Sequence, residues 1–189
     1  MSSDAAELIR ESIVAHEALL ADELLAAIGE AADAIADALR SGHKVLLFGN
    51  GGSASDATHI AAEFLGRFQR ERDPLPALAL SDNTSAVTAI ANDFGFEHVF
   101  ARQLRGLAVR GDVAIAISTS GRSPNVLAGA AAARELGLRT IALTGADGGE
   151  LANAVDIAIA VRASKTARIQ EGHILIAHVV CDLVERAIE

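Results

Sequence analysis

Four hydroxyl side chains surround a single glycine in the segment 118–124, at Ser118, Thr119, Ser120 and Ser123. The segment follows an apolar run and carries a proline where a helix should begin, so its hydroxyls would lie at the positive end of that helix. Such small neutral donors suit a phosphate dianion and leave room for a sugar. A plain helix start needs only one capping serine. The surplus hydroxyls therefore favour a phosphate-binding loop.

A second loop of the same kind reads Gly49-Asn50-Gly51-Gly52-Ser53. Consecutive glycines let the backbone approach a ligand closely, and the start of a helix presents free N–H groups. The loop matches neither a Walker loop nor a dinucleotide-binding fingerprint. By itself it is also compatible with a tight strand-to-helix turn in which Ser53 is the N-cap.

Side chains that could bind a metal or move a proton occur in two further segments. His59 and Glu63 are four residues apart, on one face of a helix, so they could share a metal ion or a substrate. Gln170 and His178 lie in the last helical stretch. A His–Glu pair at this spacing is often only solvated, and a lone histidine among apolar residues, such as His178, is usually a core residue. His173 could neighbour the site, but we favour a structural role for it. A functional role for these residues therefore depends on the other motifs.

The elements that must position these residues alternate between strands and helices. Short apolar runs bounded by Gly, Pro, Ser or Asp predict five buried strands, at residues 45–48, 77–80, 113–117, 141–143 and 157–161. Helix-like segments lie between and after them, at residues 53–68, 97–109, 123–136 and 166–188. This alternation predicts an α/β fold with a five-stranded parallel sheet flanked by helices. In such sheets ligands bind outside the carboxyl ends of the strands, where both loops described above should lie.

The first forty residues predict helices with an apolar stripe of their own. Apolar side chains recur there at three-to-four-residue steps, and Ser41 and Gly42 supply a stop signal. This is more helix than a lead-in to a sheet requires, so we expect the N-terminal helices to pack against another subunit. We expect one domain over residues 1–189, with an N-terminal helical segment (1–42) and an α/β core (43–189).

Composition narrows the class of protein. A length of 189 residues with 51% hydrophobic side chains suits one well-buried domain. The net charge of -9 disfavours a nucleic-acid partner. Neither a basic leader nor a membrane-spanning apolar run is evident, so the expectation is a cytoplasmic protein without a membrane partner. Cys181 is the sole cysteine, which excludes an internal disulfide and suggests a small buried hydrophobe.

Taken together, five ordered motifs resemble the phosphoheptose isomerase family, whose members have a SIS (sugar isomerase) domain. They are residues 49–53, the pair His59 and Glu63, residues 88–93, residues 118–123, and residues 166–171 with His178. The resemblance covers nearly the whole chain. It implies aldose–ketose isomerisation of sedoheptulose 7-phosphate through an enediolate, to D-glycero-D-manno-heptose 7-phosphate or to a heptose 7-phosphate related to it as an anomer or epimer. It also implies a homotetramer with active sites at subunit interfaces.

The resemblance further implies roles for individual residues. Glu63 would be the catalytic base and His178 the acid. One zinc ion per subunit would be bound by His59, Glu63, Gln170 and His178. The substrate would contact Asn50, Gly51, Gly52, Ser53, Glu63, Asn92, Asp93, Ser118, Thr119, Ser120, Ser123 and Gln170.

Two physical constraints bear on this assignment. A cation bound to Glu63 would lower its basicity, so the roles of ligand and base compete. Gln170 and His178 would be about 12 Å apart along one helix. They can meet at one ion only if both side chains extend toward each other, or if the site draws on more than one subunit.

Other functions stay open. One alternative is a non-catalytic SIS binding module that resembles the replication-initiator-associating protein of bacteria. Another is a sugar-phosphate sensor without turnover, and a third is an isomerase or etherase for amino sugars, which usually has a longer chain. The presence of both Glu63 and His178 favours the enzyme. Lys165 and Arg168 could add positive charge near the phosphate, or could simply be solvated.

Overall fold

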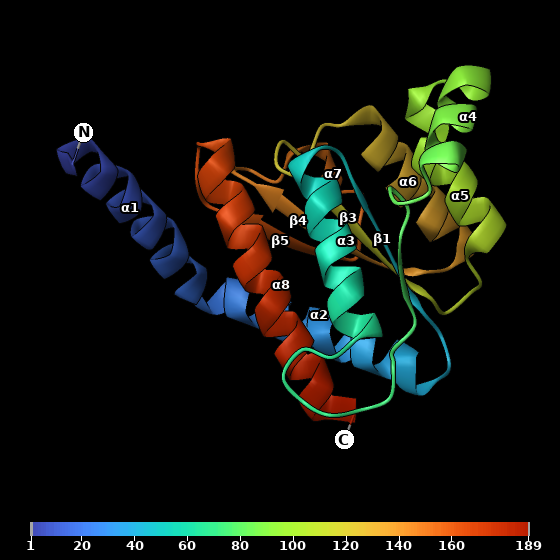
Figure 1. Cartoon of the computed structure of the whole chain (residues 1–189), viewed down its shortest axis with the longest axis horizontal. Coiled ribbons are helices and arrows are strands. Elements are labelled where there is room, and N and C mark those ends of the chain that lie inside the picture. The colour runs from blue at the N-terminus through green and yellow to red at the C-terminus, as the bar shows by residue number, and fades with distance from the viewer. Residues whose placement is uncertain (1, 189) are drawn as a thin grey trace.

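The computed structural model describes residues 2–188, which form a parallel sheet covered by helices on both faces (Figure 1). The sheet has five strands in the order β2-β1-β3-β4-β5, and every neighbouring pair is parallel. The strands are β1 (Val45–Gly49), β2 (Ala77–Ala79), β3 (Val113–Ser118), β4 (Arg139–Gly145) and β5 (Ile157–Val161). This arrangement confirms the predicted α/β fold and its five strands.

Alternate residues of the strands enter two separate apolar cores. Leu47 and Ile115 face helices α2 (Asp22–Arg40), α3 (Gly52–Leu65) and α8 (Thr166–Ile188). Phe48 and Ala116 face α5 (Val99–Leu107), α6 (Pro124–Leu136) and the short α7 (Gly149–Ala152). Burial on both faces explains why these strands read as continuous apolar runs.

The N-terminal helical segment divides into two helices. Helix α1 (Ser2–Glu17) ends in a short 3-10 turn, η1 (Ala18–Leu20), and Ala21 is extended before α2 begins. Helix α2 buries its apolar stripe against the sheet. Helix α1 extends away from the body of the molecule (Figure 1). Its Ile9 and Ile13 are 60% and 50% exposed, so part of the predicted stripe is uncovered in a single chain.

Helix α4 (Thr84–Phe94) was missed by the apolar pattern. None of its residues is fully buried, but Val87, Ile90 and Ala91 recur at helical spacing and pack against the second core, so a short apolar stripe was present in the sequence. Gly95, at φ 96°, then separates α4 from a 3-10 turn, η2 (Phe96–His98), and from α5. The helix predicted at residues 97–109 therefore begins slightly later than expected.

Two buried residues confirm structural interpretations made from the sequence. Cys181 is 1% exposed, and burial, followed by the nearby charge of Glu63, raises the pKa of its thiol to about 12. His173 is fully buried with Nε2 2.9 Å from the Thr144 carbonyl oxygen, and burial lowers its pKa. Within residues 2–188, no helix combines the length and the hydropathy needed to cross a membrane.

Candidate active site

Helices α3 and α8 bring three of the predicted metal ligands to one point. His59 and Glu63 lie one turn apart on α3, with 3.3 Å between His59 Nε2 and Glu63 Oε1. His178 on α8 places its Nε2 3.0 Å from the same His59 nitrogen. One ligand atom from each residue lies within 4.8 Å of the other two. The spacing of His59 and Glu63 was visible in the sequence, but their meeting with His178 depends on the packing of α3 against α8.

The chemistry of this cluster fits zinc. Two imidazole nitrogens and one carboxylate oxygen form a donor set that zinc accepts, and three protein ligands leave a position for substrate. Two Nε2 atoms at 3.0 Å require that at least one ring present a lone pair, because two N–H groups would clash there. His59 is 48% exposed and Glu63 23%, so the cluster can be reached from solvent.

Gln170, the fourth predicted ligand, lies against the first glycine-rich loop. A methyl group added at Gly52 would overlap the amide nitrogen of Gln170, so a larger residue here would require the Gln170 side chain to move. The first turn of α8 is thereby packed against the start of α3. Gln170 thus connects the loop to α8, about two turns before His178.

The first loop is an irregular turn that passes directly into α3. The N-cap of α3 is Gly51, without a side-chain hydrogen bond, and Ser53 lies buried inside the helix. The interpretation of Ser53 as an N-cap is therefore wrong. The capping hydrogen bonds come from the backbone instead, with the Ser53 N–H donating to the Asn50 carbonyl at 3.0 Å.

The second loop keeps its hydroxyls free of helix capping. Ser123 is the N-cap residue of α6, yet its side chain makes no capping hydrogen bond. Its Oγ lies 3.1 Å from the Oγ of Ser118, and Ser120 Oγ accepts from the Arg122 N–H at 3.2 Å. The surplus hydroxyls noted in the sequence therefore gather around one turn at the start of α6.

A pair of asparagines joins the two loops. Gly49 and Ile117 pair where the neighbouring strands β1 and β3 end, which places both loops on one edge of the sheet. The amides of Asn50 and Asn125 then exchange two hydrogen bonds, each of 2.8 Å. Asn125 is 3% exposed and was missed, because nothing in the local sequence distinguishes it from other residues in a first helical turn.

The two residues of the motif at 88–93 that the resemblance assigns to the substrate lie on α4. Asn92 and Asp93 are exposed, and the Asn92 amide donates to Asp93 Oδ1 at 2.8 Å. A hollow of about 160 Å³ separates the first loop from this part of the chain, with Asn50, Ser81 and Phe96 in its lining. The contacts of Asn92 and Asp93 do not join them to the His59 cluster within one chain.

The structure adds a buried carboxylate near the cluster that sequence reasoning missed. Glu185 is 2% exposed and accepts hydrogen bonds from three consecutive backbone N–H groups, those of residues 68–70. Burial alone would raise its pKa, but these hydrogen bonds and the charge of Arg72 hold the pKa of Glu185 below its usual value. The same segment places the Phe68 ring 5.3 Å from the ring of His178.

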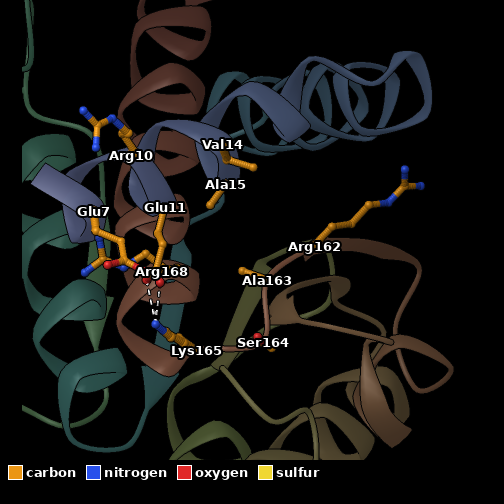
Figure 2. A pocket seen from close by; sticks show the side chains of 10 residues that line it. All are labelled: Glu7, Arg10, Glu11, Val14, Ala15, Arg162, Ala163, Ser164, Lys165 and Arg168. Atoms are coloured by element: carbon orange, nitrogen blue, oxygen red, sulfur yellow. Dashed lines mark hydrogen bonds and ion pairs between the residues drawn. The ribbon is translucent and has the colours of Figure 1, made fainter. Parts of the chain in front are cut away.

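A separate hollow of about 510 Å³ lies between α1 and the residues that follow β5 (Figure 2). Lys165 pairs there with Glu11 at 2.6 Å, and Arg168 donates to the Leu8 carbonyl at 2.9 Å. Arg10 and Arg162 point away from the hollow (Figure 2). Lys165 and Arg168 thus contact the middle of α1, next to the start of α8.

Comparisons with known proteins agree with this geometry. Residues 9–145 match the SIS domain family. The chain is 50% identical over 183 residues to the phosphoheptose isomerase of Geotalea daltonii, covering 95% of each chain, and 54% identical over 161 residues to that of Aquifex aeolicus, covering 85% and 84%.

Solved structures give the same answer. The phosphoheptose isomerase of Francisella tularensis superposes with a TM-score of 0.92 at 39% identity, covering 98% of this chain and 99% of that one. The enzyme from Neisseria gonorrhoeae superposes with a TM-score of 0.86 at 43% identity, covering 98% and 96%. The chain therefore belongs to the phosphoheptose isomerase family of SIS-domain proteins.

Proposed function

We propose that this protein is an aldose–ketose isomerase that converts sedoheptulose 7-phosphate to D-glycero-D-manno-heptose 7-phosphate. The observation that carries the proposal is the convergence of Glu63, His59 and His178 at one solvent-accessible point. A carboxylate beside an imidazole provides the base and the acid that such an isomerisation needs.

The reaction moves one hydrogen between neighbouring carbons. Starting from the ketose, the Glu63 carboxylate takes a proton from C1 and the C1–C2 double bond forms, which leaves negative charge on the C2 oxygen as an enediolate. His178 then donates a proton to this oxygen. The resulting enediol returns the proton from its C1 hydroxyl to His178, and Glu63 delivers its proton to C2. The aldose results, and both side chains regain their starting protonation.

A zinc ion, one per subunit, is part of the proposal, with His59, Glu63, Gln170 and His178 as its ligands. When bound, it supplies positive charge beside the oxygen that becomes negative along the reaction. The same charge would lower the basicity of Glu63, so a weakly coordinated carboxylate suits the role of base. The His59 ring beside Glu63 keeps this carboxylate oriented, at 3.3 Å.

Substrate binding is assigned to the loops at the carboxyl edge of the sheet. The phosphate is held by Ser118, Thr119, Ser120 and Ser123, whose hydroxyls are not used to cap α6. The sugar is contacted by Asn50, Gly51, Gly52, Ser53, Asn92, Asp93 and Gln170. Because the Asn50 side-chain amide already pairs with Asn125, its free hydrogen and lone pair are what remain for the substrate.

The active form in this proposal is a cytoplasmic homotetramer with sites at subunit interfaces. Each chain is one SIS domain, in which residues 1–42 form the helical segment that supports assembly and 43–189 the α/β core. The exposed apolar side chains of α1 support this, since Ile9 is 60% and Ile13 50% exposed. Helix α4, which buries none of its residues, offers a second surface to another copy.

The test is turnover of sedoheptulose 7-phosphate by the purified protein in D₂O, with and without added zinc. The wild type should form the aldose and incorporate deuterium at C2, because the base can exchange its proton with solvent. Glu63→Gln and His178→Ala should abolish both signals. Glu135→Gln is the matched control, since Glu135 is an exposed glutamate on α6 that pairs with Arg105. A wild type that binds the phosphosugar and never converts it would establish the binding module or sensor instead.

A further inference from the structure

Two charged side chains near the candidate active site, Arg72 and Glu185, are almost entirely buried. The Arg72 side chain is 11% exposed and that of Glu185 is 1% exposed, with 2.9 Å between Arg72 Nε and Glu185 Oε1. Buried ion pairs add little net stability on average, because removing two charges from water offsets much of their attraction. Net stability therefore does not explain why Arg72 and Glu185 are buried together. The hydrogen bonds that each side chain makes to the backbone suggest another role.

Glu185 fixes the path of the chain after α3. Its Oε1 accepts from the Phe68 N–H at 2.8 Å, and its Oε2 accepts from the N–H groups of Gln69 and Arg70 at 2.8 and 3.0 Å. A carboxylate that gathers three successive backbone N–H groups holds that segment in one conformation. Because Glu185 is on α8, this segment is tied to the helix that carries His178.

Arg72 fixes the end of α3. Its guanidinium donates to the Glu63 and Phe64 carbonyl oxygens, both at 2.9 Å, which belong to the last turn of the helix. These carbonyls have no partners within the helix. The Arg72–Glu185 ion pair therefore bridges the turn of α3 that carries Glu63 to the helix that carries His178.

Phe68 connects the segment that Glu185 holds to the side chain of His178. Its ring lies 5.3 Å from that of His178, at an interplanar angle of 31°. The ring of His59 lies 5.3 Å from the same imidazole, at an angle of 57°. His178 is thus held between the other metal-binding histidine and a phenyl ring whose backbone N–H is bound by Glu185.

We propose that Glu185 and Arg72 are positioning residues for this active site, setting the placement of Glu63 relative to His178 through Phe68 and the end of α3. The inference rests on the proposed function for its kinetic consequence. Displacements of about 1 Å in an active site can cost about 10²-fold in rate.

Glu185→Gln tests the inference with little change in shape. The amide replaces one acceptor oxygen with an N–H₂ group that would face backbone N–H donors. We expect kcat to fall by about 10- to 100-fold with KM within about threefold of the wild-type value. The His178 Cε1–Hε1 cross-peak should also move in the NMR spectrum of the metal-free protein, a readout that does not require turnover.

Asp112→Asn is the matched control. Asp112 is also a fully buried carboxylate, held by Lys44 Nζ at 2.6 Å and by the Val109 N–H at 2.9 Å, where β3 begins and thus at the opposite edge of the sheet. It should lose stability without changing kcat or the His178 cross-peak. If it lowers kcat as much as Glu185→Gln does, the effect is general loosening and the inference is wrong.

A double variant tests the route through Phe68. In a Phe68→Leu background, Glu185→Gln should have a smaller effect on kcat than it has in the wild type, because the contact that it acts through is already altered. Fully additive effects would overturn this part of the inference.

Should Glu185→Gln fail to fold, Arg72→Lys takes its place, since lysine keeps the charge but loses the fork that reaches two carbonyls. It should lower kcat at least about tenfold, and a wild-type kcat would refute the inference. A wild-type protein that never converts the sugar would defeat the proposed function alone. In that case the His178 cross-peak still decides the positioning role, because an unmoved peak in Glu185→Gln contradicts it.

Discussion

The helices that carry the His59 cluster and the helices that surround them differ in how far one chain completes them. Helices α3 and α8 bury side chains such as Phe64 and Ile176 in the core and meet each other directly. Helix α4 buries none of its residues, and α1 leaves Ile9 60% exposed. The difference shows that His59, Glu63 and His178 meet within one chain, whereas the outer helices leave apolar side chains uncovered.

The neighbouring helices α1 and α2 show the same contrast at closer range. Helix α2 inserts Ile28 and Ile35 into the core beneath the sheet. Helix α1 is held by polar contacts instead, such as Ser12 Oγ donating to Glu171 Oε2 at 2.7 Å and Lys165 pairing with Glu11 at 2.6 Å. One apolar periodicity in the sequence thus has two outcomes, a stripe buried in its own core and a stripe left outside.

The largest effect on kcat should come from the cluster that α3 and α8 form within one chain. We expect Glu63→Gln to lower kcat by about 10²- to 10⁴-fold, because the amide cannot accept the proton from C1. If the cluster is complete within one chain, this variant should keep the sedimentation coefficient and the melting temperature of the wild type. A change in assembly would break the comparison, because it would mean that the Glu63 carboxylate is itself needed to hold subunits together.

A second test concerns the core beneath the sheet. Ile35 is 1% exposed, so Ile35→Ala should lower the free energy of unfolding by about 2–5 kcal/mol, measured by urea denaturation. Asp33→Ala, at an exposed site on the same helix, should change it by less than about 0.5 kcal/mol. Equal losses in the two variants would mean that α2 is not the helix completed by its own chain.

Substitutions on the exposed apolar side of α1 should weaken the association of subunits. Ile13 is 50% exposed in a single chain, and Ile13→Glu should raise the concentration at which the oligomer dissociates by at least tenfold, about 1.4 kcal/mol per contact. Ala26→Glu adds the same charge at an exposed position of α2 and serves as the control. Sedimentation over a range of concentrations measures both. An unchanged dissociation midpoint for Ile13→Glu would exclude α1 from the subunit contact.

The smallest expected effect is a pH dependence of the free energy of unfolding, caused by a carboxylate inside the chain, Asp112. Burial opposes ionisation of Asp112, but hydrogen bonds from Lys44 and from backbone N–H groups hold its pKa below the usual value. Stability from this group is therefore complete above the ordinary aspartate pKa and is lost as the pH falls toward the lowered one. Asp112→Asn should flatten this part of the pH profile, measured by urea denaturation. The loss should not depend on protein concentration, as it would if acid acted on subunit contacts.

The local sequence pattern predicted the buried strands and the residue pairs that lie one helical turn apart. The strands were recognisable because Val45–Gly49 and its neighbours are buried on both faces, and His59 and Glu63 because one helical turn separates them. Helix α4 was missed although Val87, Ile90 and Ala91 recur at helical spacing, because its apolar stripe is short and only partly buried. Gln170 and His178 share one helix, as expected, but Gln170 meets the loop at Gly52 while His178 meets His59.

Contacts between distant segments could not be read in this way. Arg72 and Glu185 are 113 positions apart, and Asn50 and Asn125 are 75 apart. Each pair consists of common polar residues with no distinctive neighbours in the sequence. Their partners are decided by how α3, α6 and α8 pack on the sheet, which no short window contains.

The enclosed thiol of Cys181 has a practical consequence. It is the sole cysteine of the chain, it lies on α8 one turn beyond His178, and its pKa of about 12 leaves almost no thiolate at neutral pH. A thiol-specific dye can therefore modify the protein only during moments when α8 separates from the sheet. The labelling rate would therefore measure how often α8 separates from the sheet. It would also report how substrate, metal or assembly slows this opening, with no engineered label.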